Sequence, residues 1–142
     1  MTNKIKIIIL LIIITSCSTK RISKNTKPLF EILVSAQYGG NKFEFYELIT
    51  EENEFKMLLS DDELSKLVQP KDIKTANFIL ANLGEKNTGG YKIVVDKIEE
   101  LPDKIKIYFK TISPKPGANV TMAITNPYCV VKINSKKPIE IE

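Results

Sequence analysis

The stretch Ala76–Gly84, "ANFILANLG", is the segment of the sequence that decides the fold. It is a nearly continuous apolar run and lacks the polar alternation of a strand with one wet face. A short run of this kind predicts a strand in the middle of a sheet, covered on both faces. The rest of the chain must therefore supply two covering layers.

Three more strands are predicted downstream, over residues 90–99, 104–112 and 120–133, the last interrupted at Asn126-Pro127. The middle one, "KIKIYFKTI", alternates Lys and Tyr with Ile and Phe, which indicates one dry face and one wet face. Turn residues stand between these strands, at 101–103 and at 114–117. The downstream half therefore predicts β-structure.

Upstream, residues 29–40 and 42–50 are rich in aromatic and β-branched residues and are separated by Gly39-Gly40-Asn41. Two such runs around a short Gly-containing turn predict a β-hairpin. The second run has apolar residues on both faces, so its pattern is not one-sided.

The spacing of apolar residues becomes helical over residues 55–68. The sequence "SDDE", Ser60 to Glu63, has the form of a capping box, and we expect two short helices that meet near Ser60. A metal cluster is the alternative for Asp61, Asp62 and Glu63. Adjacent carboxylates at a helix start point in different directions and lack partners at calcium-loop spacing, so we predict a cap and no metal site.

These elements predict an α+β domain over residues 29–142, with mainly antiparallel β-sheets forming a sandwich or a partial barrel. A short helical insertion is expected after the first hairpin.

The N-terminus predicts export. Lys4 and Lys6 precede eight apolar residues, Ile7–Ile14, which is too short a run to span a bilayer and is typical of a signal peptide over residues 1–16. The order Ile14-Thr15-Ser16-Cys17 resembles a bacterial lipobox. We therefore expect Cys17 to be acylated, with palmitate-like chains, and to anchor the protein in the lipid bilayer of the cell envelope. An ordinary signal peptide is the alternative reading.

Residues 17–28 are expected to be the acylated cysteine and a flexible tether. The four cations of this segment also suit contact with anionic headgroups. We expect the outer membrane, with the periplasmic or surface face left open.

The charge of the chain excludes a nucleic-acid partner. Its 21 basic residues include Lys4 and Lys6, so 19 remain against 17 acidic residues once the signal is removed, a net charge of about +2. Cys129 is then left without a partner inside the chain, and we expect a buried thiol, with an intermolecular disulfide as the alternative.

The sequence does not predict an enzyme. It contains no histidine, which excludes Ser-His-Asp and Cys-His machinery. Gly89-Gly90 leads into a strand and not into a helix, so it is no phosphate-binding loop. We expect no catalytic residues, no cofactor and no metal.

Several short motifs in order resemble the C-terminal domain of the PrcB family of protease-complex subunits. They are Leu83-Gly84, Thr88-Gly89-Gly90-Tyr91, Pro114, Pro116-Gly117, Val120-Thr121 and Pro127-Tyr128, and "AQYGG" at 36–40 resembles an earlier element of the family. The resemblance spans about residues 30–135. It implies a non-catalytic lipoprotein subunit, in a family named after the partner of a secreted, subtilisin-like protease. It does not imply that this protein has such a protease.

We expect the protein to bind an exported protease or another envelope protein. The candidate partner-binding residues lie in two Gly- and Pro-rich loops and are Thr88, Gly89, Gly90, Tyr91, Pro116 and Gly117. Each also has a structural explanation: the glycines as turn residues and Tyr91 as an aromatic at the core edge. The alternatives are a protease inhibitor, since "NTGGY" distantly resembles a loop of chagasin-type inhibitors, and a structural envelope lipoprotein.

Overall fold

The computed structural model of the chain describes residues 27–142. The predicted signal peptide, Cys17 and most of the predicted tether lie outside the described residues. No helix among the described residues has the length and apolar character needed to cross a membrane. The elements, in chain order, are β1 (Phe30–Ala36), β2 (Glu44–Ile49), α2 (Glu52–Ser60), the 3-10 turns η1 (Leu64–Lys66) and η2 (Asp72–Lys74), β3 (Asn77–Leu83), β4 (Lys92–Glu100), β5 (Ile105–Ile112), β6 (Tyr128–Ile133) and β7 (Ile139–Ile141).

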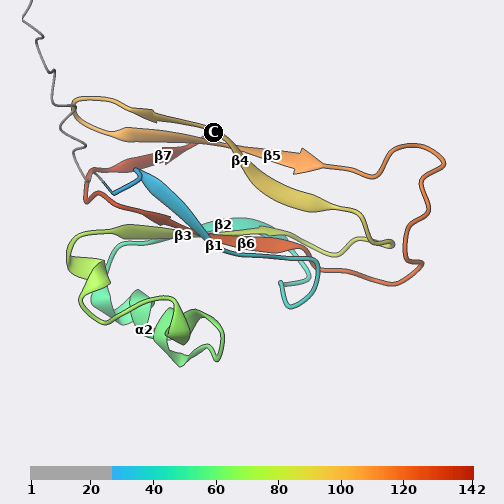
Figure 1. Cartoon of the computed structure of the whole chain (residues 1–142), viewed down its shortest axis with the longest axis horizontal. Coiled ribbons are helices and arrows are strands. Elements are labelled where there is room, and N and C mark those ends of the chain that lie inside the picture. The colour runs from blue at the N-terminus through green and yellow to red at the C-terminus, as the bar shows by residue number, and fades with distance from the viewer. Residues whose placement is uncertain (1–26) are drawn as a thin grey trace, which may run out of the picture.

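The elements form three layers (Figure 1). An antiparallel sheet in the order β1-β6-β3-β2 lies in the middle. A second sheet, β4-β5-β7, packs on one face of it, and α2, η1 and η2 cover part of the other face. The predicted sandwich of mainly antiparallel sheets is confirmed.

Strand β3 is central and covered on both faces, as "ANFILANLG" predicts. It pairs with β2 on one side and with β6 on the other, and six of its seven residues are buried. Residues of opposite parity enter the two cores: Phe78 faces the helices and Ile79 faces the second sheet. The continuous apolar run is thus explained by two separate cores.

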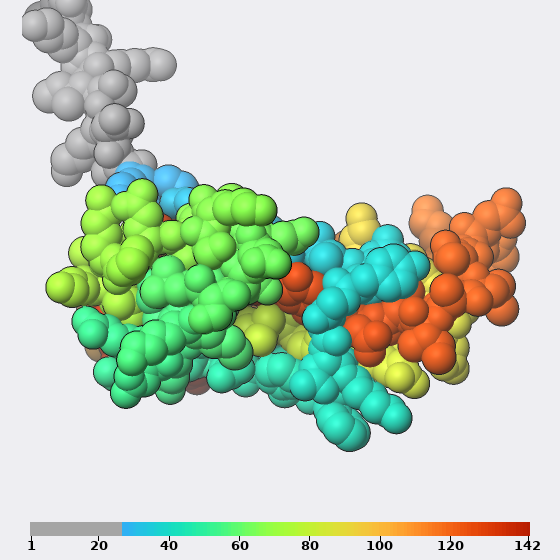
Figure 2. Space-filling view, turned by 90° about the horizontal axis from the view of Figure 1, so that it is seen from below, coloured from blue at the N-terminus to red at the C-terminus, as the bar shows by residue number. Residues whose placement is uncertain are grey.

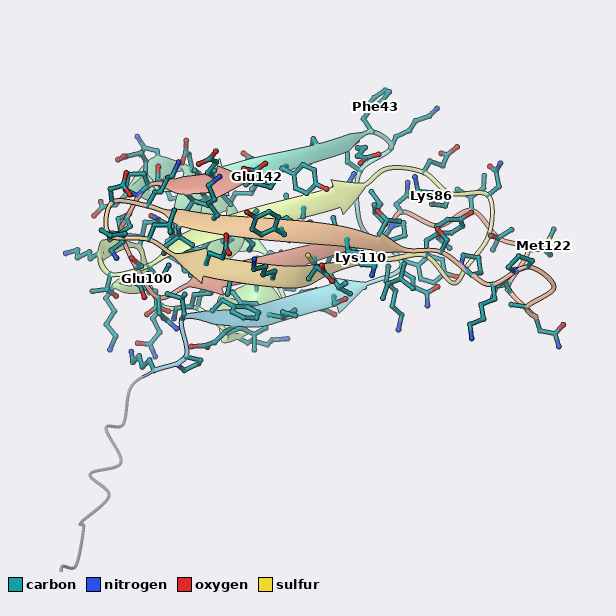
Figure 3. All side chains as sticks on the ribbon, turned by 90° about the horizontal axis from the view of Figure 1, so that it is seen from above. Phe43, Lys86, Glu100, Lys110, Met122 and Glu142 are labelled. Atoms are coloured by element: carbon teal, nitrogen blue, oxygen red, sulfur yellow. The ribbon has the colours of Figure 1, made fainter. Side chains whose placement is uncertain are left out.

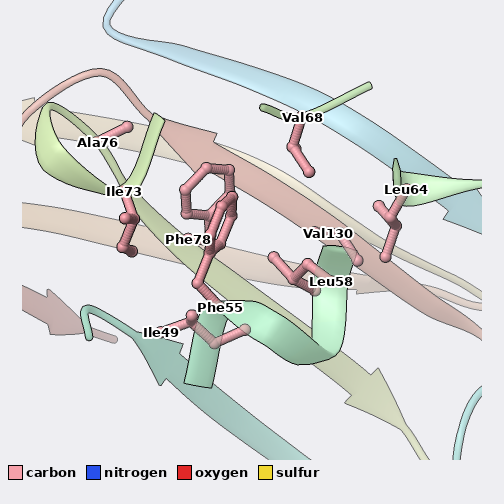
Figure 4. Close-up of a cluster of buried hydrophobic side chains, with 9 residues drawn as sticks. All are labelled: Ile49, Phe55, Leu58, Leu64, Val68, Ile73, Ala76, Phe78 and Val130. Atoms are coloured by element: carbon pink, nitrogen blue, oxygen red, sulfur yellow. The ribbon is translucent and has the colours of Figure 1, made fainter. Parts of the chain in front are cut away.

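The helix-side core is built around Phe55 of α2 and Phe78 of β3, whose ring centroids lie 4.7 Å apart (Figure 4). Ile49, Leu58 and Ile73 complete its buried centre. Helix α2 is held on the sheet by this contact. Its exposed side carries the polar residues of an amphipathic helix.

The core between the sheets explains the alternation of "KIKIYFKTI". Ile105 and Ile107 are fully buried, whereas Lys104 and Lys106 lie outside and pair with Glu140 and Glu142 of the C-terminal segment. One dry face and one wet face are confirmed. β2 also faces this core, through Leu48 and through Tyr46, whose ring lies 5.3 Å from that of Phe109.

The predicted hairpin between the first two strands is wrong. β1 pairs with β6 and β2 pairs with β3, so the two strands form opposite edges of one sheet. The turn residues between them cross the ends of the two strands in between: Gly40 N–H donates to the Asn126 carbonyl (3.0 Å) and Asn41 N–H to Asn82 Oδ1 (2.8 Å). The hydrogen-bond partners of this segment come from residues in or next to the two strands that lie between β1 and β2. In a hairpin turn, the partners would come from the two joined strands themselves.

The two helices expected near Ser60 are one α-helix and a 3-10 turn. α2 ends at Ser60, and the next element is the short η1. The residue that caps the second turn is Asp61, whose Oδ1 accepts from the N–H groups of Glu63 and Leu64 at 2.9 Å each, while Ser60 Oγ donates back to the Lys56 carbonyl. The cap therefore lies one residue later than predicted.

The last predicted strand is shorter than expected, and another follows it. Residues 120–127 form a loop with a single bridge, Lys86 to Thr125, and β6 begins only at Tyr128. β7 pairs parallel with β5, through Ile105 opposite Ile139. The alternation Ile139-Glu140-Ile141-Glu142 was the available signal for this strand.

Candidate functional site

Three loops meet at one end of the sandwich, formed by residues 37–43, 84–91 and 113–127 (Figure 1, right). We call this the loop end. It lies opposite the end at which β1 begins, because β1 runs from Phe30 toward the 37–43 loop. Both loops singled out from the sequence belong to it.

Backbone hydrogen bonds join the three loops into one unit. Asn126 donates to the Gln37 carbonyl (3.0 Å) and accepts from Gly40 (3.0 Å), while Lys86 and Thr125 exchange two bonds of 2.8 and 2.9 Å. Paired backbone groups hold loops in a fixed conformation. The loop end is therefore a preorganised surface.

Thr88, Gly89 and Gly90 bond to the other two loops of this unit, and Thr88 and Gly90 are half-buried. Gly89 is buried, and its N–H donates to the Thr121 carbonyl at 2.8 Å. Gly90 has a φ of +89°, and its N–H donates to Gln37 Oε1 at 3.2 Å. The Thr88 carbonyl accepts from Thr125 Oγ1 at 2.9 Å. These residues shape the loop end from within.

Tyr91 is half-buried at the edge of the inter-sheet core. Lys86 Nζ lies 6.0 Å from the centroid of its ring, at the outer limit of a cation–π contact. The sequence left open whether Tyr91 points inward or outward. The structure places it against the core, as an aromatic that supports the loop.

Pro116 and Gly117 are exposed at the tip of the 113–127 loop. Gly117 has a φ of +76° in a turn closed by Ala118 N–H and the Lys115 carbonyl, and no atom lies within 4 Å of the position its Cβ would take. The base of this loop meets the other candidate loop, because Pro114 and Val120 pack over Gly90. The two predicted loops thus adjoin, and only the second has candidate residues that are fully exposed.

The most exposed apolar side chains of the loop end were missed by the sequence reasoning. They are Tyr38, Phe43, Met122 and Ile124, with exposed fractions of 56%, 71%, 85% and 60%. Figure 3 shows Phe43 and Met122 projecting at this end, with Lys86 between them. Large apolar side chains within loop segments were the available signal. Exposed apolar groups on a rigid frame are typical of protein-binding surfaces.

Cys129 offers no reactive thiol. It is buried between the sheets, and burial raises the pKa of the thiol to about 12. Nucleophilic cysteines require the opposite shift. Among residues 27–142 no group of three His, Cys, Asp or Glu side chains is placed to hold a metal ion.

The two candidate loops and the strands that carry them are similar to a known family. Residues 77–134 match the family described as PrcB C-terminal. The match begins at β3 and ends just after β6, so the matched region contains the 84–91 and 113–127 loops and both central strands of the middle sheet. The helical insertion and the 37–43 loop precede it. The resemblance seen in the motifs is confirmed over these residues.

A relative from Methanocaldococcus jannaschii, described as an uncharacterized protein, is 41% identical over 70 residues. The similarity covers 49% of this chain and 41% of that protein, so the chain spans less than half of the relative's length. No solved structure matches the chain.

Proposed function

We propose that this protein is a non-catalytic accessory subunit that binds an exported partner, a protease in the first instance, through the loop end. The PrcB C-terminal match suggests an association with protease complexes. The observation that carries the proposal is the group of exposed apolar side chains, Tyr38, Phe43, Met122 and Ile124, on loops tied together by hydrogen bonds. Exposed apolar side chains on a rigid frame bind protein without a large ordering cost.

The geometry of the sandwich suits a tethered binding protein. β1 begins at the end opposite the loops, so an anchor at Cys17, joined through residues 18–28, holds the molecule by its far end. Attachment at the far end leaves the loop end free to meet a partner. We therefore propose a lipid-anchored protein of the cell envelope whose binding surface is open to the exported space.

The test is partner capture after crosslinking in cells that produce the full chain. The double variant Met122→Asp, Ile124→Asp removes apolar surface from the loop end, and we expect it to lose the exported partner that the unchanged chain captures. Leu67→Asp is the matched control, because Leu67 is half exposed on the helical insertion, away from the loops. Equal capture by all three chains, or capture of nothing but abundant envelope proteins, would contradict the proposal.

A protease inhibitor is the second candidate, and the meeting of three loops at one end of a sandwich favours it. The "NTGGY" segment itself is poorly suited to enter a protease cleft, because Gly89 is buried and Tyr91 packs on the core. An inhibitor would have to use the Met122 side of the loop end instead. Titration of the full chain against cysteine and serine proteases separates the two functions, since an accessory subunit leaves activity intact.

A further inference from the structure

The helices leave part of the middle sheet uncovered. Cross-strand neighbours form rows on the helix side of this sheet: Ile49-Phe78-Lys132, then Glu47-Leu80-Val130, then Phe45-Asn82-Tyr128. The core under α2 and the 3-10 turns buries Phe78 and Ile49 of the first row and Val130 of the second, and Leu80 and Tyr128 are only partly buried against it. The third row, nearest the loop end, is therefore only partly covered.

A groove results, between the helical insertion and the 37–43 loop. Figure 2 shows the hollow between the green helical segment and the cyan loop. Its volume is about 390 Å³, within the range of clefts that bind small molecules and side chains. Gly39, Gly40 and Asn41 form one wall, and the opposite wall carries Met57, Leu58 and Leu64.

The floor of the groove is apolar and rigid. It consists of Phe45, Leu80 and Tyr128, with Val130 buried beneath the helical wall. Asn82, at the loop end of the floor, is buried, and its side-chain amide bonds the backbone of Asn41 and Phe43. The hydrogen-bonding groups of the Asn82 side chain are thus satisfied by the 37–43 loop. The surface that the floor offers to a ligand is mainly apolar.

The rim of the groove is acidic. Glu47 lines it from β2 and Asp61 from the segment after α2, where the hydrogen bonds to Glu63 N–H and Leu64 N–H fix the carboxylate. Burial raises the pKa of Tyr128, and the negative charges of Asp61 and Glu63 raise it further. Tyr128 on the floor therefore lies in a negative potential.

This acidity is part of a marked charge asymmetry. Residues 44–63 hold eight of the 17 carboxylates of the chain and a single basic residue, Lys56, whereas the whole chain has a net charge of +4. None of the eight takes part in an ion pair among residues 27–142. An apolar floor beneath unpaired carboxylates is complementary to a lysine or arginine, whose long stem is apolar and whose head is charged.

We propose that this groove docks a short segment of the partner protein in which a lysine or arginine stands beside apolar residues. The stem of the basic side chain packs on Phe45 and Tyr128, and its cation meets Glu47 and Asp61. This inference rests on the proposed function, since it assigns the chemistry of a second contact with the bound partner.

The direct test measures binding of a capped pentapeptide, Leu-Arg-Leu-Lys-Val, to the full chain in mild detergent by fluorescence polarisation. We expect saturable binding that weakens with salt, and no binding of the matched peptide Leu-Glu-Leu-Glu-Val. The double variant Glu47→Gln, Asp61→Asn should weaken binding by about tenfold or more. Asn at position 61 retains an oxygen that caps η1, so the fold is kept.

The control is Glu52→Gln, Asp62→Asn, which also removes two negative charges, but from residues that do not line the groove. We expect it to change the affinity by less than about twofold. Equal losses in the two double variants would show a diffuse charge effect and overturn the site. Failure of the basic peptide to bind the unchanged chain would also overturn it.

The basic residues of the chain itself are the competing occupant. If segment 18–26 filled the groove, its deletion would raise the affinity for the basic peptide several-fold, and a partner would no longer be needed. Unchanged affinity after the deletion supports an external ligand.

Partner capture separates this inference from the proposed function. If the chain captures an exported partner equally well with and without Glu47→Gln, Asp61→Asn, the groove inference fails and the loop-end function stands. If the basic peptide binds but no exported partner is captured, the proposed function fails and the groove remains a peptide site.

Discussion

Lys132 of β6 and Asp72 of η2 form an ion pair with a distance of 3.0 Å between Nζ and Oδ2, although they lie 60 residues apart in the chain. The two side chains are only 12% and 17% exposed. The Gln69 N–H also donates to the same carboxylate oxygen, at 3.1 Å. This pair fastens the helical insertion to a central strand.

Replacement of Asp72 by Asn should destabilise the domain by about 2 kcal/mol near neutral pH, because it leaves the Lys132 ammonium largely buried without its counter-charge. Urea unfolding monitored by circular dichroism measures the loss. Asp62→Asn, which removes an exposed carboxylate of the same insertion, is the control and should change stability by less than about 0.5 kcal/mol. A loss no larger than that of the control would show that the pair adds nothing.

The same pair predicts the direction of acid sensitivity. Burial by itself raises the pKa of Asp72, but the hydrogen bonds from Lys132 and from the Gln69 N–H outweigh it and hold the pKa below its usual value. Because the folded pKa is the lower one, the stabilisation is present above the unfolded value of 3.8 and is lost as pH falls through the folded pKa. The stability difference between the unchanged chain and Asp72→Asn should therefore shrink below about pH 4.

Cys129 should resist thiol reagents while the protein is folded. Its pKa of about 12 leaves almost no thiolate at pH 8, and its side chain is buried. We expect labelling by a maleimide only after denaturation, in a chain that carries Cys17→Ala so that one thiol remains. Rapid labelling of the folded chain would contradict the burial of Cys129. It would then favour the alternative, an intermolecular disulfide at this residue.

The glycines of the loop end should differ in their tolerance of a side chain. Gly90 and Gly117 both have positive φ, but a Cβ at Gly90 would lie 3.1 Å from Pro114 Cβ and 3.2 Å from Val120 Cγ1, whereas one at Gly117 meets nothing within 4 Å. Gly117→Ala should therefore cost about 1 kcal/mol, the cost of the backbone conformation alone. Gly90→Ala should cost about 1 kcal/mol more. Thermal unfolding measures the loss of stability in each variant. Equal losses would mean that Pro114 moves aside without an energetic cost.

Membrane association should depend on Cys17. We expect the full chain to sediment with membranes and Cys17→Ala to appear in the soluble fraction, because a single acylated residue supplies the anchor. Cys129→Ala is the control and should remain with the membranes. Sedimentation of both variants would favour another means of attachment, such as the cations of residues 18–28.

The strands with a strong period were predictable, because burial imposes that period directly. Ile105 and Ile107 alternate with lysines for the reason the sequence suggests, and the run around Phe78 and Ile79 is apolar because it serves two cores. Which strands pair was not predictable in the same way. Gly39-Gly40-Asn41 is an equally good turn whether it joins two neighbours or crosses two strand ends.

The sequence predicted which loops form the candidate site. It did not predict which side chains those loops expose. Gly and Pro mark the loops correctly, but Gly89 is buried by Gln37 and Thr121, which come from distant parts of the chain. The groove beside Tyr128 has no sequence signal of its own, since it depends on how far α2 extends over the sheet. Residues brought together across 40 residues or more leave no local pattern.

The pairing of β1 with β6 bears on the order in which the domain is completed. Phe30, at the start of β1, lies opposite Ile133 in β6. The backbone groups of β1 therefore have no strand to bond until β6 has been synthesised. A nascent chain that emerges from its N-terminus has no native place for β1 until about a hundred residues have followed, and such distant pairings are slow to form. β1 therefore remains unpaired until β6 has been made, whereas β2 and β3 can pair much earlier.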